Sequence, residues 1–168
     1  MSGKRAVIFG ASGGIGAAIT TQLRRSGDFA TVLTGMRSEG GDFRFDLTDE
    51  PSIAVAASTI AAQGSVDLVI VATGVLHTDD GHGPEKSWRV IDPARMAHVF
   101  ALNTIGPALI AKHVLPLLNR DRRAVFAALS ARVGSIGDNR LGGWHSYRAS
   151  KAALNMLIRT FAIELAHR

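Results

Sequence analysis

The chain has 168 residues, 46% of them hydrophobic and 20% charged, which suits one globular domain with a single core. It holds no cysteine, which excludes a disulfide framework and thiolate chemistry, and no unbroken apolar run of the ~18 residues that a membrane span needs. The net charge of +5 comes from dispersed basic residues without interleaved aromatics. We therefore expect a cytoplasmic protein that binds neither a membrane nor nucleic acid.

Short apolar runs between turn residues predict strands over residues 5–9, 31–34, 43–45, 66–72 and 123–129. Helical spacing and capping residues predict the helices between them. The first begins near residue 15 and is closed by Gly27, the second runs from the cap Thr48 to about residue 63, and two more cover 93–119 and 146–166. Gly106-Pro107 predicts a local break in the third helix, because proline has no backbone N–H to donate.

Strands that alternate with helices are typical of a parallel sheet with right-handed crossovers. The expected fold class is α/β, a doubly wound parallel sheet of the Rossmann dinucleotide-binding type. We take residues 1–168 as a single dinucleotide-binding and catalytic domain. Its sheet would end at the strand over 123–129, which would then be an apolar edge.

A glycine-rich turn with the pattern Gly10-x-x-x-Gly14-x-Gly16 lies between the first strand and the first helix. Gly10 and Gly14 would permit a tight turn and close backbone approach, and Gly16 would let the helix pack on the strand. The helix N-terminus offers free N–H groups to a pyrophosphate, and Ser12 could add a hydroxyl. A flexible turn without a ligand is the alternative, but the strand–turn–helix context favours a dinucleotide.

The residue that selects between NAD and NADP is expected after the second strand. That stretch, Thr34-Gly35-Met36-Arg37-Ser38, has no acid for a ribose 2′-hydroxyl. Arg37 is placed to pair with a 2′-phosphate, unless it is an ordinary exposed loop arginine. The sequence therefore favours NADP(H), and NAD(H) stays possible.

Tyr147 and Lys151 are spaced i, i+4, which puts them on one face of the last helix. An ammonium near a phenol lowers the phenol pKa toward neutrality, so the pair suits general acid/base catalysis. Tyr147 is the only tyrosine of the chain. Ser130 follows the last predicted strand, where a hydroxyl could hold a substrate carbonyl or simply belong to a turn. The six histidines show no compact ligand pattern, so we expect no metal site.

Several motifs follow one another along the chain: Gly10-Ala-Ser-Gly-Gly-Ile-Gly16, Asp46-Leu47, Ala72-Thr73-Gly74, Asn103-Thr-Ile-Gly106, Ser130 and Tyr147-Arg-Ala-Ser-Lys151. Their order and spacing resemble the short-chain dehydrogenase/reductase family over essentially all 168 residues. Residues 130–139 also resemble the C-factor-like branch of that family. The resemblance implies hydride transfer between a nicotinamide cofactor and a small carbonyl or alcohol substrate.

The resemblance also implies a catalytic set. Ser130 would polarise the substrate carbonyl, Tyr147 would donate or accept the proton, and Lys151 would lower the tyrosine pKa and hold the nicotinamide ribose. Asn103 would hold a water in a proton relay with Lys151. The family usually continues beyond the tyrosine helix with further strands and a substrate-covering segment, so the resemblance predicts a C-terminally truncated fold with uncertain activity of its own.

The cofactor-binding residues implied by the resemblance lie in the glycine turn and after three of the strands. They are Gly10, Ser12, Gly13, Gly14, Ile15, Gly16, Arg37, Asp46, Leu47, Ala72, Thr73 and Gly74, together with Tyr147 and Lys151. Asp46 and Leu47 would lie by the adenine ring, and Ala72 and Gly74 would line the adenosine ribose. Ala72 departs from the family, which often has asparagine there.

Three functions remain open on these residues. The first is an NADP(H)-dependent carbonyl reductase or alcohol dehydrogenase. The second is a non-catalytic dinucleotide-binding or signalling protein, which the C-factor-like stretch favours. The third is an epimerase or dehydratase of the same fold. The family commonly pairs subunits through two long helices, which correspond here to 93–119 and 146–166, so we expect a homodimer or homotetramer.

Overall fold

The computed structural model describes residues 3–77, 81 and 83–166. Two of the six histidines, His82 and His167, lie outside the described residues. The chain forms two compact units. The first consists of Met1–Thr73 and Leu109–Leu129, and the second of Gly74–Ala108 and Ser130–Arg168.

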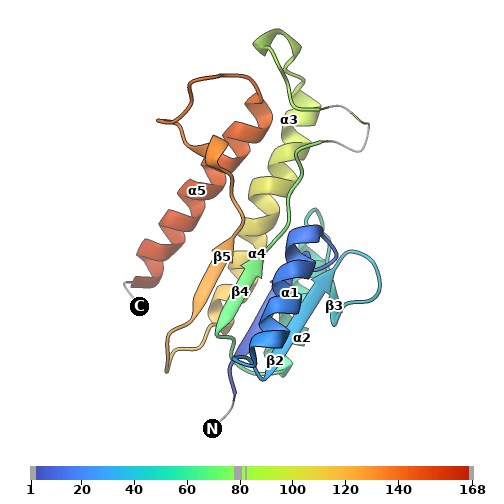
Figure 1. Ribbon diagram of the computed structural model, residues 1–168, viewed down its shortest axis with the longest axis vertical. Helices are drawn as coiled ribbons and strands as arrows, with labels where there is room; N and C mark the ends of the chain where they lie inside the picture. Colours follow the sequence, from blue (N-terminus) through green and yellow to red (C-terminus); the bar gives the residue numbers. More distant parts are fainter. Residues whose placement is uncertain (1–2, 78–80, 82, 167–168) are drawn as a thin grey trace. The chain divides into compact units, whose positions relative to one another are not determined.

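The first unit is built on a five-stranded sheet with the order β3-β2-β1-β4-β5 (Figure 1). The strands are β1 (Arg5–Phe9), β2 (Thr31–Met36), β3 (Phe43–Arg44), β4 (Leu68–Val71) and β5 (Val125–Ala128). All neighbouring pairs are parallel. The doubly wound parallel fold class is therefore confirmed, with β5 as an edge strand. The two longest predicted strands are each shorter than the apolar run that predicted them.

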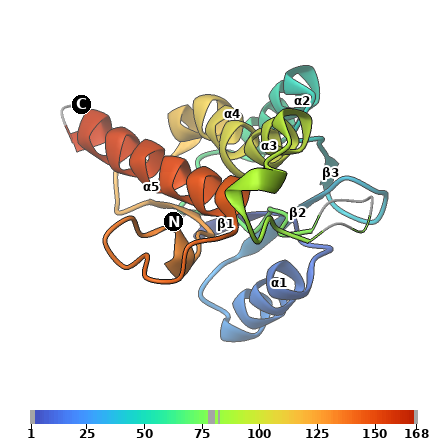
Figure 2. The ribbon, with the colours of Figure 1, turned by 90° about the horizontal axis from the view of Figure 1, so that it is seen from above.

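Helices cover both faces of this sheet. Figure 2 shows α1 (Gly14–Ser26) on one face and α2 (Glu50–Ala62) on the other, with α4 (Gly106–Val114) beside α2. The core on the α2 face is formed by alternate strand residues and apolar helix residues, including Val7, Phe9, Ile53, Ile60 and Ile110. The intervening strand residues Ala6 and Ile8 are also fully buried, as expected of a central parallel strand covered on both faces.

The predicted cap of α2 was wrong by one residue. The N-cap is Asp49, and Pro51 lies in the first turn as expected. Thr48 does not cap the helix, because its backbone N and its Oγ1 both donate to Asp46 Oδ1, at 2.8 and 2.6 Å. The hydroxyl thus serves the turn before the helix and fixes the Asp46 carboxylate.

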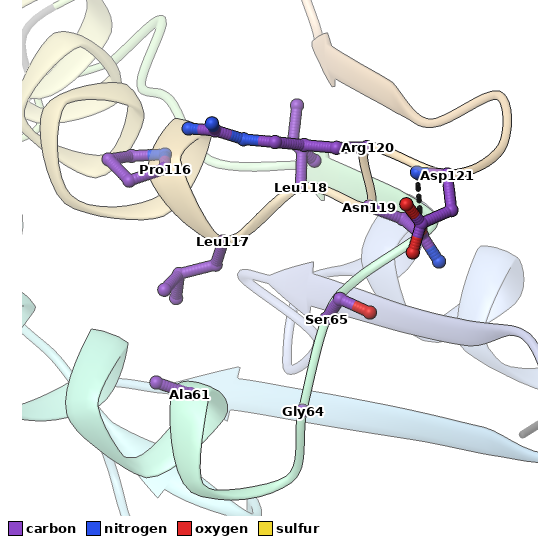
Figure 3. Close-up of a pocket in the computed structure, with 9 residues that line it drawn as sticks. All are labelled: Ala61, Gly64, Ser65, Pro116, Leu117, Leu118, Asn119, Arg120 and Asp121. Carbon is purple, nitrogen blue, oxygen red and sulfur yellow. Dashed lines mark hydrogen bonds between the residues drawn. The ribbon is translucent and has the colours of Figure 1, made fainter.

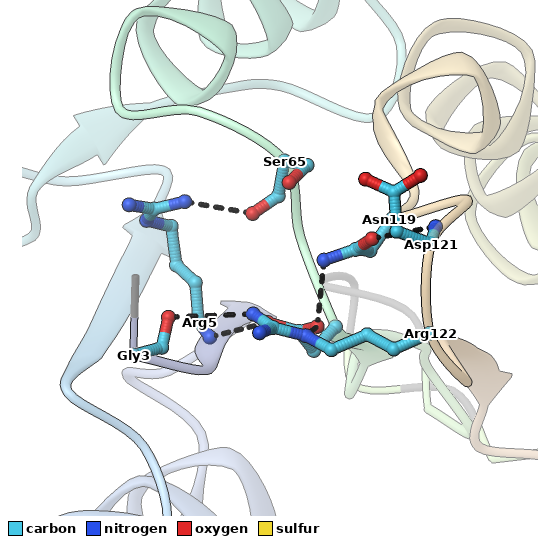
Figure 4. Close-up of polar contacts among 7 residues, drawn as sticks. Gly3, Arg5, Ser65, Asn119, Asp121 and Arg122 are labelled. Carbon is cyan, nitrogen blue, oxygen red and sulfur yellow. Dashed lines mark hydrogen bonds and ion pairs between the residues drawn. The ribbon is translucent and has the colours of Figure 1, made fainter. Parts of the chain in front are cut away.

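A buried carboxylate, Asp67, joins the loops at the amino ends of β1, β4 and β5. Its partners Arg5, Asn119 and Arg122 are labelled in Figure 4. Asp67 accepts hydrogen bonds from the backbone N of Arg5 at 2.8 Å, from Asn119 Nδ2 at 3.2 Å, and from both Nε and Nη2 of Arg122, the latter at 2.9 Å. The hydrogen bond from Arg122 is the largest cause that lowers the pKa of Asp67. This end of the sheet is therefore closed by internal ion pairing.

The second unit contains α3 (Pro93–Phe100), the π-helical turn η2 (Ala101–Ile105), two short 3₁₀ turns η1 (Trp88–Val90) and η4 (Arg132–Gly134), and α5 (His145–Ala166). Helix α5 packs against α3, η2 and η4. The predicted single helix over 93–119 is thus a series of segments, which ends in the 3₁₀ turn η3 (Leu115–Leu117). The break predicted at Gly106-Pro107 takes the form of the π turn immediately before it.

Among the described residues, one helical stretch, Pro93–Leu117, is long and apolar enough by length and composition to cross a membrane. Buried core helices have the same composition, and 44% of the apolar window of this stretch is buried within the protein. The expectation that no membrane is bound stays a prediction.

Candidate functional site

The glycine turn after β1 is closed on itself. The backbone N atoms of Gly10 and Ala11 donate to Gly35 O at 3.0 and 3.1 Å, and Gly13 N donates to Gly10 O at 3.2 Å. Gly10 has a φ of 86°, and a Cβ there would lie 2.9 Å from Thr73 Cγ2. A Cβ at Gly16 would lie 2.2 Å from Gly10 O. Gly10 therefore requires glycine for its positive φ and its close approach to Thr73, and Gly16 requires it for close packing of backbone on backbone.

The N-terminus of α1 is open, in contrast to the closed turn beneath it. Ser12, Gly13, Gly14 and Ile15 are exposed, and a Cβ at Gly14 would meet nothing within 4 Å. The N-cap Gly13 provides no side-chain hydrogen bond, and the first turn has no acidic residue. Unpaired N–H groups at a positive helix end without competing carboxylates suit a phosphate, so these residues fit the dinucleotide that the fold implies.

The other predicted cofactor residues of the first unit follow β2, β3 and β4. Because Phe9 pairs with Gly35 and with Val71, the loops after β1, β2 and β4 leave the sheet at the same edge. Arg37 is exposed there. The Oγ1 of Thr73 is buried and has no hydrogen-bond partner among the described residues.

Asp46 and Leu47 lie just beyond β3. The side-chain hydrogen bond from Thr48 is the largest cause that lowers the pKa of Asp46, and the positive charge of Arg37 adds to it. Leu47 is half-buried and packs against the core. Asp46 is thus held as a carboxylate near Arg37.

In the second unit, Asn103 connects the π turn to the residue after Gly74. Its Oδ1 accepts a hydrogen bond from Val75 N at 2.8 Å, and its Nδ2 donates to Val75 O at 2.9 Å and to Ser150 Oγ at 3.2 Å. The side-chain amide is therefore fully used in internal contacts. The backbone carbonyl of Asn103 lacks its usual i+4 donor, because that position is Pro107.

Lys151 is 3% exposed and lies beside this contact, since a Cβ at Gly74 would approach Asn103 Oδ1 at 2.9 Å and Lys151 Nζ at 3.1 Å. Its Nζ is 5.9 Å from the centroid of the Tyr147 ring. Burial lowers the pKa of Lys151 and raises the pKa of Tyr147. The predicted lowering of the tyrosine pKa by the lysine is therefore not found in the chain alone, because desolvation of the phenol is the larger effect.

Ser130 and Tyr147 both belong to the second unit. Ser130 is exposed, and among the described residues no hydrogen bond joins it to Tyr147. Tyr147 is half-buried, and its ring meets Trp144 edge-on with the centroids 6.3 Å apart. The structure thus brings together Asn103, Gly74 and Lys151 of the predicted residues, with Tyr147 one turn away on α5.

Sequence reasoning missed two carboxylates that shape these segments. Asp42 Oδ2 accepts hydrogen bonds from Thr34 N and Thr34 Oγ1, both at 2.7 Å, which closes the loop that carries Arg37. Glu85 is buried against Ser146 at the start of α5. Each carboxylate bonds a residue whose distance along the sequence follows no periodic pattern. Only the residue type of these two side chains could have pointed to them.

Two pockets are lined by none of the predicted catalytic residues, whereas a small third pocket in the second unit is lined by Tyr147, Ser146 and Glu85. One of about 450 Å³ in the first unit is lined by Ala61, Ser65, Leu118 and Arg120 among others, at the amino end of the sheet (Figure 3). One of about 440 Å³ in the second unit is mostly apolar and is lined by Met96, residues 133–136 and the α5 residues Arg148, Ala149 and Ala152, among others. Among the described residues no group of three His, Asp or Glu side chains could hold a metal ion.

Comparison with known proteins shows which family this geometry represents. The family model described as short chain dehydrogenase matches residues 4–168. The chain belongs to the short-chain dehydrogenase family. This confirms the resemblance stated from the motifs and places the chain in a family of oxidoreductases.

Individual relatives agree with that assignment. The chain is 30% identical over 170 residues to 1-hydroxy-2-glutathionyl-2-methyl-3-butene dehydrogenase of Rhodococcus sp. (strain AD45), and the match covers 95% of the chain and 70% of the relative. It is 34% identical over 110 residues to C-signal of Myxococcus xanthus, covering 66% and 63%. The NADPH-bound carbonyl reductase from chicken fatty liver has a TM-score of 0.84 at 25% identity, covering 98% and 71%. The chain thus spans 63–71% of the length of these proteins.

Proposed function

We propose that this chain is the cofactor-binding and catalytic part of an NADP(H)-dependent oxidoreductase that interconverts a carbonyl and an alcohol, with Tyr147 as general acid/base. The observation that carries the proposal is the arrangement on α5. Lys151 is buried beside Asn103 and Gly74, and Tyr147 lies one turn before it on the same helix. Burial lowers the pKa of Lys151, and titratable groups with shifted pKa values are concentrated at functional sites, which favours a functional role for this lysine.

The residues of the first unit would hold the dinucleotide. The open N-terminus of α1 would bind the pyrophosphate through Gly14 and Ile15, with Ser12 adding a hydroxyl. Arg37 would pair with a 2′-phosphate, which makes NADP(H) the preferred form and leaves NAD(H) as the weaker ligand. The adenosine would be lined by Asp46, Leu47, Ala72 and Thr73. When bound, the nicotinamide supplies or accepts the hydride.

Tyr147 would handle the proton of the reaction. Burial keeps its phenol protonated at neutral pH, which is the form that can donate a proton to a carbonyl oxygen during reduction. Ser130 would donate a hydrogen bond to the same oxygen and orient the substrate. Lys151 would bind the nicotinamide ribose, and the Asn103 carbonyl freed by Pro107 would hold a water that returns the proton.

The phenylalanine variant of the only tyrosine tests this role. Tyr147→Phe should lower kcat for NADPH-dependent reduction of a test ketone by about 10²- to 10⁴-fold, the usual contribution of a general acid. NADPH affinity, measured by fluorescence, should stay within about twofold because the phenyl ring keeps the packing. A variant that reduces the ketone as fast as the wild type would exclude Tyr147 as the proton donor.

The cofactor preference is tested by two arginine variants, one after the carboxyl end of β2 and one before the amino end of β5. Arg37→Ser should weaken NADPH binding by about 10- to 100-fold, as loss of a charge-assisted contact predicts, and leave NADH binding unchanged. Arg123→Ser removes the same charge from an exposed residue just before β5 and should change neither. Equal losses in both variants would mean that Arg37 acts only through net charge.

A second candidate function is dinucleotide binding without turnover, in sensing or signalling, and the 34% identity to C-signal favours it. In that case the wild-type chain would bind NADPH but reduce no carbonyl. We further propose a cytoplasmic homodimer or homotetramer that pairs through the long helices, with a single domain over residues 1–168. Sedimentation of the purified chain tests the assembly.

A further inference from the structure

One buried carboxylate of the second unit is not used by the proposed chemistry. Glu85 is 3% exposed and lies in the irregular segment before α3, about sixty residues upstream of α5. Its Oε1 accepts a hydrogen bond from Ser146 Oγ, and its Oε2 accepts one from Ser146 N at 3.2 Å. In Figure 2 the segment before α3 passes beside the first turn of α5.

The backbone of Glu85 also contacts this turn. Trp144 N donates to Glu85 O at 2.5 Å. Trp144 has a φ of 55°, a left-handed conformation that is unfavourable for a bulky residue and persists only where surrounding contacts impose it. Three donors from residues 144–146 thus converge on Glu85, and they fix the direction in which the chain enters α5.

The charge of Glu85 fits this position. Burial raises the pKa of Glu85, the hydrogen bonds from Ser146 lower it, and the net direction is downward. His145 adds a favourable charge when protonated, and Arg95 lines the same small cavity. A carboxylate at a helix N-terminus is stabilised by the helix dipole, so Glu85 is ionised at neutral pH.

Tyr147 is the residue directly after Ser146, and it shares a small cavity with Glu85, Leu76 and Val99. We propose that Glu85 is a positioning residue for Tyr147: by anchoring Ser146 and Trp144 it fixes the first turn of α5 and thereby the orientation of the phenol. The inference rests on the proposed role of Tyr147 as the acid/base group. It adds a residue that touches neither the substrate nor the cofactor.

Because Tyr147 is the only tyrosine, the ultraviolet absorbance of tyrosinate in an alkaline titration reports on its phenol alone. Glu85→Gln removes the nearby negative charge and loosens the first turn, and both changes favour the phenolate. The titration midpoint should therefore fall toward that of free tyrosine, about 10. The value of kcat should fall roughly 10- to 100-fold, as a misplaced catalytic group predicts, with an unchanged KM for NADPH.

Glu164→Gln makes the same chemical change at an exposed position near the other end of α5 and should alter neither quantity. Ser146→Ala keeps the backbone hydrogen bond to Glu85 and should lower the Tyr147 titration midpoint by a smaller amount. If Glu85→Gln does not fold, this variant tests whether the anchoring by Glu85 orients Tyr147. A folded Glu85→Gln protein with the wild-type midpoint and kcat would overturn the proposal, even if its melting temperature were lower. The titration needs no turnover, so an inactive wild-type chain would count against the proposed function and leave the role of Glu85 measurable.

Discussion

Two glycines of one helical turn should respond in opposite directions to the same substitution. Gly14 and Gly16 both lie in the first turn of α1. A Cβ at Gly14 meets nothing within 4 Å, whereas one at Gly16 would lie 2.2 Å from Gly10 O, 2.9 Å from Gly10 C and 3.1 Å from Ala11 Cα. All three neighbours of a Cβ at position 16 are backbone atoms, which cannot rotate away as a flexible side chain could.

The magnitudes follow from these surroundings. Alanine gains up to about 1 kcal/mol over glycine in a helix, so Gly14→Ala should stabilise the protein by a few tenths to about 1 kcal/mol. Overpacking costs about 1–3 kcal/mol, so Gly16→Ala should lose stability in spite of the same gain in propensity. For a domain of this size, about 1 kcal/mol corresponds to roughly 2–4 °C in Tm.

Equilibrium urea unfolding, followed by circular dichroism, measures both variants on one scale. The two free energies of unfolding should differ by about 1–3 kcal/mol, because both variants gain the same helix propensity and only Gly16→Ala is overpacked. Gly16→Ala should also weaken NADPH binding, because the displaced Gly10 carbonyl belongs to the turn beneath the phosphate site. A Gly16→Ala protein as stable as Gly14→Ala would refute the close-packing argument for this turn.

Three further outcomes are expected. The lowered pKa of Asp67 contributes stability that is present above its unfolded pKa of about 3.9 and is lost as the pH falls through the lower folded value. Asp67→Asn should therefore be less stable than the wild type at pH 7 in urea unfolding, and the difference should shrink as the pH is lowered below about 4. Ile110→Ala removes a fully buried core side chain and should cost about 2–5 kcal/mol in the same assay. Gly27→Ala forces a side chain into φ 72° with open space around it and should lower Tm by the equivalent of about 1–2 kcal/mol, whereas Gly27→Asn should cost less.

The sheet could be predicted from the sequence because burial on both faces leaves a plain signal. Each strand of the parallel sheet is a short apolar run between turn residues, as in Val7–Phe9, and needs no knowledge of its partners. The glycine turn could be predicted equally well, since Gly16 is required by its contact with the backbone of Gly10 and Ala11, a few residues before it.

The wrong or missed sequence predictions concern side chains that have a choice of hydrogen-bond partners, and a pKa whose direction depends on burial. Thr48 has the right type for a helix cap, but Asp46 competes for its hydroxyl. The direction of the Tyr147 pKa depends on how far the phenol is removed from water, which the spacing to Lys151 does not encode. Glu85 was missed because its partner Ser146 is distant in sequence, and nothing local marks the pairing.

The paired hydrogen bonds between the Asn103 side chain and the Val75 backbone, here called the clamp, have a consequence for the chemical ageing of the protein. An amide can face both the N–H and the C=O of one residue, as a neighbouring strand would, because it carries one acceptor and one donor. Hydrolysis of that amide to a carboxylate would set an oxygen against the Val75 carbonyl and remove the donor to Ser150. Burial of Asn103 within a helical turn restrains the backbone attack that such deamidation requires, so the clamp protects itself from the reaction that would break it.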